Sequence, residues 1–207
     1  MGQTDATVFV LDDDAGVRAG LGRLLRAGGW NVEVFANARD FLDRSPSDVI
    51  GCILLDVKMP GMSGPELHEQ LAANRITLPV IYLTGNSTVS ISVRAMKQGA
   101  VDFLEKPVDA DALLPVVEQA VARHRGACAE RNRLDGIQHH LAQLSMRERE
   151  VMEHVIRGRL NKQIAADLNI ALKTVKVHRG RVMAKMQVRS VAELVRLCDA
   201  HGIAVAS

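Results

Sequence analysis

The chain has 207 residues, 47% hydrophobic and 24% charged, a composition typical of globular proteins and a length that suits two small domains. No apolar run approaches the roughly 20 residues that span a bilayer, and the amino terminus lacks the basic-then-apolar layout of a secretion signal. The cysteines are few, widely spaced and without metal-ligand spacing: Cys52, Cys128 and Cys198. We therefore expect reduced thiols, a cytoplasmic protein and no membrane partner.

The net charge of +2 hides an asymmetry along the chain. Residues 1–125 carry 12 Lys/Arg against 16 Asp/Glu, whereas residues 142–207 carry 12 against 6. An acidic first part and a basic last part predict two domains with different partners. Nucleic acid is the partner that a basic domain suggests, and a solvated basic face is the alternative.

Short apolar runs alternate with helical patterns over the first 120 or so residues. We expect strands near residues 7–11, 31–35, 50–55, 79–83 and 101–104. Helical stretches lie between them, such as 17–25, 65–73 and 89–98, and a final helix begins at the cap Asp109. This alternation predicts right-handed crossovers in an α/β doubly wound, five-stranded parallel sheet.

The remainder of the chain is helical in pattern. Residues 123–141 are helix-prone but weakly apolar, which predicts a helical linker rather than a stable coiled coil. Beyond them, four short helices with tight turns are expected to begin near Ser145, Asn161, Leu172 and Ser190. Capping boxes open the first and the last of these helices, and the pattern predicts a small all-α bundle over 142–207.

Polar side chains follow four of the predicted strands, at the point where each strand ends. They are Asp12, Asp13, Asp56, Thr84 and Lys106. Taken singly, each has an ordinary explanation as a helix cap or a turn residue. Because the carboxyl ends of parallel strands meet at one edge of a sheet, we expect the five side chains to form one site.

The residue types at this edge suit phosphoryl transfer to a carboxylate. Clustered acids repel one another unless a hard cation such as Mg²⁺ (or Mn²⁺) lies among them, here held by Asp13 and, through water, Asp12. Asp56 is then free to attack phosphorus as a nucleophile. The Lys106 ammonium, the Thr84 hydroxyl and the cation neutralise the phosphoryl oxygens.

Residues 6–122 resemble the receiver domain of two-component response regulators. The resemblance rests on the sequences VLDDD at 10–14, LLDVKMPGMSG at 54–64, LTG at 83–85 and FLEKP at 103–107. It implies a flavodoxin-like fold with Asp56 as the phosphoacceptor. The metal ligands that it implies are Asp12, Asp13, Asp56 and the Lys58 carbonyl. The switch residues that it implies are Thr84, Phe103 and Lys106, with a cis peptide bond between Lys106 and Pro107.

An aspartyl-phosphate phosphatase of the haloacid dehalogenase type is the enzymatic alternative. That chemistry requires a second aspartate two residues after the nucleophile, to act as a general acid. Lys58 occupies this position. We therefore expect a regulator and not an enzyme.

The helix predicted over 172–186 has one apolar and one basic side. An apolar stripe faces the bundle: Val175, Val182 and Met186. Basic residues occupy the opposite side and its flanks: Lys173, Lys176, Arg179, Arg181 and Lys185. Between Arg157 and Arg189 the only acidic residue is Asp167, whereas a merely solvated helix face usually mixes both signs of charge. The pattern therefore favours a face that binds phosphates.

The last part of the chain contains LSMREREVM at 144–152, GRLNKQIA at 158–165, TVKVH at 174–178 and KM at 185–186. Through this combination, residues 144–197 resemble a LuxR-type helix-turn-helix domain. The resemblance implies that Lys176 and Val177 reach base edges in the major groove, with Arg179 a further candidate. Phosphate contacts are implied for Asn161, Lys162, Thr174, His178, Arg181 and Lys185. The chain departs from the pattern at Ala171, where Ser is frequent, and at Gly180, which presents no side chain for a base contact.

The combination resembles the FixJ/NarL class of transcriptional response regulators, its FixJ-like branch in particular. We expect a receiver over 1–122, a linker over 123–141 and a DNA-binding domain over 142–207. A sensor histidine kinase is expected to phosphorylate Asp56 and so to promote homodimerisation through Val93, Met96 and Lys97 and binding to double-stranded DNA. RNA polymerase is a further expected partner.

The carboxyl-terminal bundle allows two alternatives to a DNA-binding domain. It could be a protein-interaction module that does not read DNA sequence. Sigma-factor-like helix-turn-helix domains share the fold, but an attached phosphorylation domain argues against them.

Overall fold

The computed structural model describes residues 5–44, 46, 49–85 and 99–200, and the chain divides into two compact units, Met1–Cys128 and Ala129–Ser207. Within the described residues, no helix is both long enough and apolar enough to cross a membrane.

The first unit is built on a five-stranded parallel sheet, which confirms the predicted fold class. The strands are β1 (Thr7–Leu11), β2 (Asn31–Phe35), β3 (Gly51–Asp56), β4 (Val80–Thr84) and β5 (Asp102–Glu105). Their order is β2-β1-β3-β4-β5, that of a flavodoxin-like sheet. Every residue of β3 and β4 is buried, because both faces of the sheet are covered.

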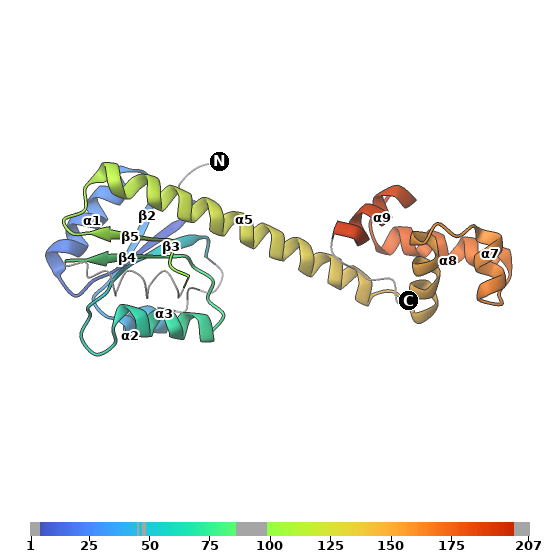
Figure 1. The fold of residues 1–207 in the computed structure, drawn as a ribbon, viewed down its shortest axis with the longest axis horizontal. Coiled ribbons are helices and arrows are strands. Elements are labelled where there is room, and N and C mark those ends of the chain that lie inside the picture. The colour runs from blue at the N-terminus through green and yellow to red at the C-terminus, as the bar shows by residue number, and fades with distance from the viewer. Residues whose placement is uncertain (1–4, 45, 47–48, 86–98, 201–207) are drawn as a thin grey trace. The chain divides into compact units, whose positions relative to one another are not determined.

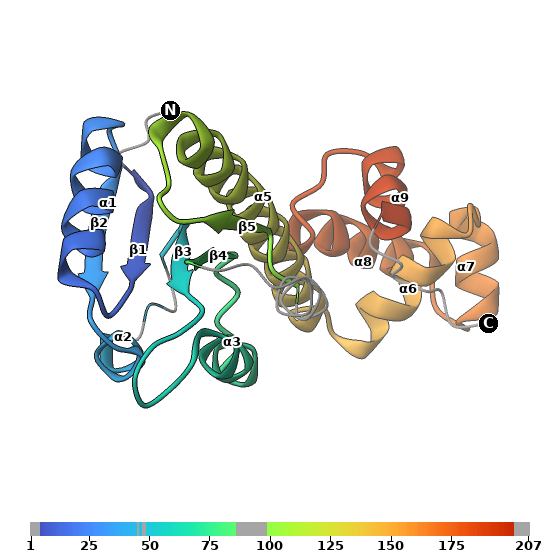
Figure 2. The same ribbon diagram turned by 60° about the vertical axis from the view of Figure 1, so that its left-hand side comes forward.

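Two layers of helices enclose the sheet (Figures 1 and 2). One face carries α1 (Ala15–Ala27) and the first part of α5 (Ala110–Ala142), and the other carries α2 (Ala38–Arg44) and α3 (Gly64–Ala73). Because successive strand residues point to opposite faces of the sheet, the strands contribute to two separate hydrophobic cores, one on each face. The core beneath α1 and α5 includes Val10, Leu54 and Ile81. The core beneath α2 and α3 includes Phe9, Ile53 and Tyr82.

Local hydrogen bonds fix where the helices begin. Asp14 caps α1 by accepting from the backbone N–H groups of Gly16 and Val17. Ser63 and Glu66 form a capping box at α3, which the sequence analysis did not predict. The helix predicted over 89–98 lies outside the described residues.

Helix α5 is continuous and covers the predicted linker. It begins after Asp109, whose carboxylate accepts from the N–H of Ala112 at 2.8 Å. Its first turns are anchored in the sheet by Leu113, Val117 and Val121, which are all buried. Residues 129–135 are exposed, so this stretch has no apolar core of its own to pack against among the described residues.

The second unit contains the four predicted short helices, α6 (Met146–Ile156), α7 (Asn161–Asp167), α8 (Leu172–Lys185) and α9 (Val191–Ala200). Their apolar faces, with the end of α5, form one core. The predicted stripe of α8 is buried within it: Val175, Val182 and Met186. The capping box that opens α6 is confirmed, since Ser145 and Glu148 bond reciprocally.

Candidate functional site

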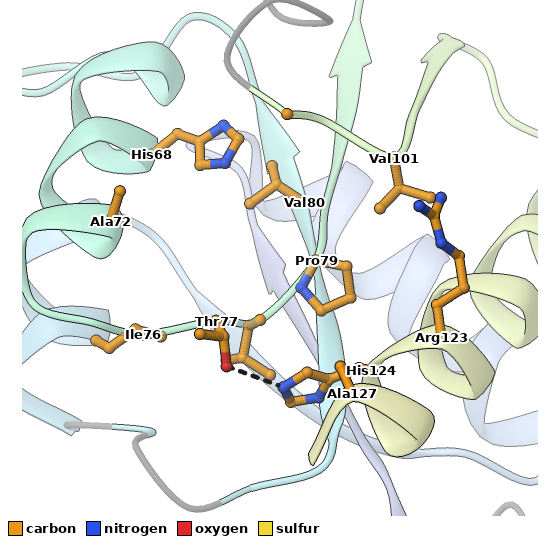
Figure 3. A pocket seen from close by; sticks show the side chains of 12 residues that line it. His68, Ala72, Ile76, Thr77, Pro79, Val80, Val101, Arg123, His124 and Ala127 are labelled. Carbon is orange, nitrogen blue, oxygen red and sulfur yellow. Dashed lines mark hydrogen bonds between the residues drawn. The ribbon is translucent and has the colours of Figure 1, made fainter. Parts of the chain in front are cut away.

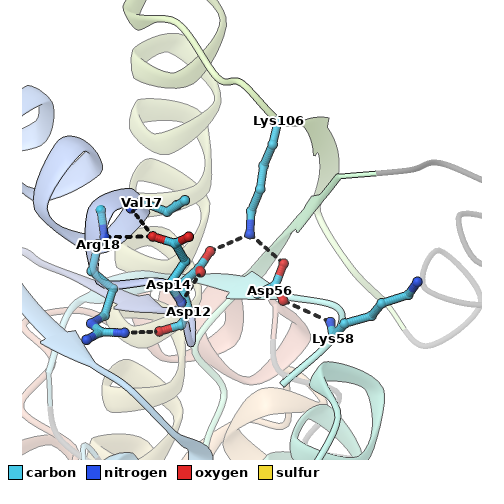
Figure 4. A network of polar contacts seen from close by, with 8 residues as sticks. Asp12, Asp14, Val17, Arg18, Asp56, Lys58 and Lys106 are labelled. Carbon is cyan, nitrogen blue, oxygen red and sulfur yellow. Dashed lines mark hydrogen bonds and ion pairs between the residues drawn. The ribbon is translucent and has the colours of Figure 1, made fainter. Parts of the chain in front are cut away.

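Asp12, Asp56 and Lys106 meet at the carboxyl edge of the sheet (Figure 4). The Lys106 ammonium lies 2.5 Å from Asp12 Oδ2 and 2.7 Å from Asp56 Oδ1. Both carboxylates are almost fully buried, at 0% and 5% exposure. The three residues come from the ends of β1, β3 and β5, so the parallel topology brings together groups as far as 94 positions apart in the sequence.

Backbone contacts hold this arrangement in place. The N–H of Lys58 donates to Asp56 Oδ2 at 3.0 Å, which fixes one carboxylate oxygen while the other contacts Lys106. The N–H of Lys106 donates to the carbonyl of Thr84 at 2.7 Å, which joins the end of β4 to the site. The Lys106–Pro107 peptide bond is cis, as expected.

Burial and charge act in opposite directions on these groups. Burial raises the pKa of Asp56, and the Lys106 hydrogen bond and charge only partly oppose it. Burial also acts to lower the pKa of Lys106, but its hydrogen bonds to Asp12 and Asp56 outweigh that effect and raise it. The ammonium is therefore a fixed positive charge beside a carboxylate that has lost most of its hydration, an arrangement suited to binding an added anionic group.

The remaining predicted members of this edge differ in exposure. Asp13 is exposed, whereas Thr84 is buried at the end of β4. Phe103 is half-buried and packs on Tyr82, with ring centroids 6.1 Å apart. No group of three or more His, Cys, Asp or Glu side chains among the described residues is gathered closely enough to hold a metal ion. The oxygen donors of Asp12, Asp13, Asp56 and the Lys58 carbonyl nevertheless match the chemistry that Mg²⁺ prefers.

Arg18 is a neighbour of the site that the sequence analysis missed. Its Nη1 donates to the backbone carbonyl of Asp12 at 2.7 Å (Figure 4). The residue lies on the first turns of α1, six positions after Asp12, so the contact depends on how α1 leaves the sheet. The periodicity of α1 gives no signal for it.

The second unit presents a basic face along α8. Lys176, Val177, Gly180 and Arg181 are exposed, and Lys162 of α7 is exposed as well. Thr174 and His178 are half-buried beside them. Thus Lys176 and Val177, the residues predicted to reach base edges, are open to a partner.

Arg179 and Asn161 form a pair that joins α8 to the start of α7. Arg179 Nη1 donates to Asn161 Oδ1 at 2.6 Å. The two residues line a surface hollow of about 570 Å³ with Leu160, Lys162, Leu172 and Lys176. The guanidinium keeps further N–H donors, but its direction is set by Asn161.

Lys185 has a different environment from the one its predicted phosphate role requires. Its ammonium contacts Glu148 Oε2 at 2.5 Å and donates to the carbonyl of Gln143 at 3.0 Å. Glu148 is only 2% exposed, so Lys185 is the counter-ion of a buried carboxylate. Helical spacing placed Lys185 on the flank of the basic side but could not show that α6 supplies an acid there.

The predicted dimer face of Val93, Met96 and Lys97 lies outside the described residues.

Comparison with known protein families gives two matches, one for each unit. Residues 8–118 match the response regulator receiver domain, and residues 142–198 match the bacterial regulatory proteins of the LuxR family.

Individual relatives match along nearly the whole chain. The transcriptional regulatory protein FixJ of Bradyrhizobium diazoefficiens is 42% identical over 97% of this chain and 98% of its own length. Among solved structures, the response regulator StyR matches 95% of this chain and 100% of its own, with 44% identity and a TM-score of 0.91. Full-length FixJ from B. japonicum matches 97% and 99%, with 41% identity and a TM-score of 0.60.

Proposed function

Because this chain belongs to the response regulators that join a receiver domain to a LuxR-type helix-turn-helix domain, we propose that Asp56 is its phosphoacceptor. The protein is a phosphorylation-dependent DNA-binding transcriptional regulator, and its two domains imply a kinase partner and DNA. The reading as a protein-interaction module that ignores DNA sequence is not favoured. The observation that carries the Asp56 assignment is a buried carboxylate 2.7 Å from the Lys106 ammonium at the edge of the sheet.

The roles at this edge follow from charge. An Asp56 oxygen attacks the phosphorus of a phosphohistidine, and the histidine leaves with the electron pair of the broken P–N bond. The Lys106 ammonium moves from an ion pair with Asp56 to one with the phosphoryl oxygens. The residues that would hold Mg²⁺ are Asp12, Asp13, Asp56 and Lys58, the last through its carbonyl, and the ion would add further neutralisation of the phosphoryl oxygens.

A switch to the rest of the domain runs through the ends of β4 and β5. The Thr84 hydroxyl turns toward the phosphoryl group, and Phe103 takes a more buried position against Tyr82. The surface that follows, with Val93, Met96 and Lys97, then forms the homodimer contact. In the cytoplasm, where the chromosome lies, the dimer places two DNA-binding domains on neighbouring half-sites and meets RNA polymerase.

On DNA, exposure separates the expected roles. Lys176 and Val177 contact base edges, and Arg179 acts with Asn161 as a pair oriented toward the same groove. Lys162 and Arg181, both exposed, hold phosphates, with Thr174 and His178 beside them. We assign Lys185 a structural role instead, because Glu148 and the Gln143 carbonyl already occupy its ammonium.

The Asp56 assignment is tested by phosphorylation with acetyl phosphate and Mg²⁺, followed by mass spectrometry of the intact chain. The wild type is expected to gain one phosphoryl group and Asp56→Asn none. Asp14→Asn is the matched control: it changes a nearby exposed carboxylate that caps α1, and Asn caps equally well. Unchanged labelling of Asp56→Asn would refute the assignment.

The DNA contacts are tested by binding to an operator and to unrelated DNA at several salt concentrations. Lys176→Gln is expected to lower the preference for the operator by about 1–3 kcal/mol. Arg181→Gln is expected to weaken binding to the operator and to unrelated DNA by the same factor, and to reduce the slope of log K against log salt by about 1. Equal effects of the two variants on preference would contradict the division of roles.

A further inference from the structure

A cavity of about 320 Å³ opens at the edge of the sheet opposite Asp56, in the first unit (Figure 3). It lies between α3, the segment leading into β4, the segment leading into β5 and α5. Val80 at the start of β4 lines it, whereas Thr84 at the end of the same strand lies at the Asp56 site. Four steps along a strand place the two about 13 Å apart, so the cavity is separate from the phosphoacceptor site.

The wall nearest α5 is held rigidly by a buried histidine. His124 is 6% exposed, and its Nδ1 accepts from the N–H of Gly51 at 3.2 Å. That bond leaves the proton of the neutral ring on Nε2, which lies 3.4 Å from Thr77 Oγ1 and 3.3 Å from Cys128 Sγ. Because Gly51 begins β3, the histidine ties α5 to the sheet and to the segment before β4, and the cavity is preformed.

The lining of the cavity combines an apolar surface with one positive charge. Its apolar members come from all four segments: Ala72, Ile76, Leu78, Pro79, Val80, Val101 and Ala127. None of the twelve described lining residues is acidic, and Arg123 is the only Lys or Arg among them. Burial lowers the pKa of His68, which disfavours a second positive charge in the lining.

Figure 3 shows how these groups are arranged. Arg123 extends beside Val101, while His68 and Ala72 of α3 stand across the opening. Among the described residues, no carboxylate forms an ion pair with Arg123. A guanidinium at the border of an apolar hollow matches a ligand with a carboxylate at one end and a hydrocarbon body at the other.

We propose that this cavity binds a small monocarboxylate with an apolar body. The guanidinium of Arg123 pairs with the carboxylate, and the body packs on Ile76, Val80 and Ala127. Arg123 is exposed, so its guanidinium stays hydrated beside a purely apolar ligand and adds nothing to the binding of that ligand. An inorganic anion gains the charge contact but covers none of the apolar wall, so a ligand with both a carboxylate and an apolar body gains from both features. The bound molecule contacts both the start of β4 and the turn of α5 at 123–127, so it holds that turn against the sheet.

The test is a titration of the full-length, unphosphorylated chain followed by ¹H–¹⁵N NMR, with three probes. Cyclohexanecarboxylate is expected to shift the amides of Thr77, Val80, Val101 and Ala127 saturably. Cyclohexanecarboxamide, with the same shape but no charge, and inorganic phosphate, with charge but no apolar body, are expected to bind at least about tenfold more weakly. Slower hydrogen exchange at residues 123–127 is expected with the carboxylate alone.

Two variants and a control locate the site. Arg123→Gln is expected to weaken binding of the carboxylate about tenfold or more and to leave binding of the carboxamide unchanged. Ala127→Trp is expected to abolish binding of both probes, because the indole fills the cavity. Arg125→Gln, on the same helix but outside the lining, should behave as wild type. The proposal is overturned if the carboxylate produces no saturable shift up to about 10 mM, far weaker than ordinary site affinities. The proposal is equally overturned if the carboxamide or phosphate binds as tightly as the carboxylate. The same holds if Arg123→Gln and Arg125→Gln weaken binding of the carboxylate to the same extent.

Discussion

At the scale of single residues, Glu148 and Lys185 show how a charge on a DNA-binding domain can serve the fold. Glu148 caps α6 through the Ser145 backbone and is buried against the core of the second unit. Lys185, at the end of α8, neutralises it across 37 positions of sequence. The pair thereby joins the first and third helices of the domain.

Lys185→Met is expected to destabilise the second unit by about 2 kcal/mol, because it leaves a buried carboxylate without its counter-ion. The measurement is urea unfolding of the full chain, followed by NMR signals of Val151 and Met152. The only Trp is residue 30, so fluorescence follows the first unit. Lys176→Met serves as the control and should change stability by less than about 0.5 kcal/mol, since Lys176 is exposed. Equal effects of the two would show that the ion pair contributes nothing.

Glu148 also predicts a pH dependence. The hydrogen bond from Lys185, with help from the Ser145 backbone, lowers the pKa of Glu148 from 4.5 to about 2. A carboxyl group with a lowered pKa in the folded state adds stability that is complete above pH 4.5 and is lost as the pH falls toward 2. Glu148→Gln should therefore flatten the fall in stability of the second unit between pH 4.5 and 2, measured by the same NMR signals. A fall of wild-type steepness in the variant would contradict this origin.

At the scale of elements, α5 joins two anchored ends through a stretch with little to stabilise it. Residues 129–135 are exposed, and one i,i+3 ion pair, Arg133 with Glu130, lies there. Gly126 and Gly136 flank this stretch, and glycine is the weakest helix former after proline. The stability of the helix is therefore expected to be lowest between them.

Gly126→Ala and Gly136→Ala should each stabilise this part of α5 by about 0.5–1 kcal/mol, because an added Cβ meets nothing within 4 Å at either position. Hydrogen exchange of amides 129–135 is the measurement, and slower exchange is expected. Gly51→Ala provides the contrast, since its Cβ would collide with the carbonyl of Thr7 and destabilise the sheet. If hydrogen exchange at residues 129–135 did not slow in these variants, the two glycines would not be the cause of low helix stability there.

The elements show where sequence reasoning succeeds and where it stops. The strands were predictable because each is a short apolar run with a polar residue at its end, as at Asp56. The meeting of Asp12, Asp56 and Lys106 followed from parallel topology alone. The partners of Lys185 and Arg179 did not, because helical periodicity shows which side a residue occupies but not which side chain of another helix stands opposite. The contact of Arg18 with the Asp12 carbonyl escaped for the same reason.

At the scale of the whole molecule, a local change of charge has to alter the binding of DNA by a separate unit. The receiver holds a buried ion pair that a phosphoryl group on Asp56 would rearrange, and the second unit holds an exposed basic helix. Coupling between such sites is typically worth about 1–3 kcal/mol, or 5- to 150-fold in affinity. Phosphorylation is expected to act within this range.

The most direct test of this account is the affinity of the full chain for operator DNA before and after treatment with acetyl phosphate and Mg²⁺. Wild-type affinity is expected to rise by about tenfold or more. Asp56→Asn should bind as the untreated wild type does and gain nothing from the treatment. A gain in the Asp56→Asn variant equal to that of the wild type, or no gain in a wild type shown to be phosphorylated, would contradict Asp56 as the switch.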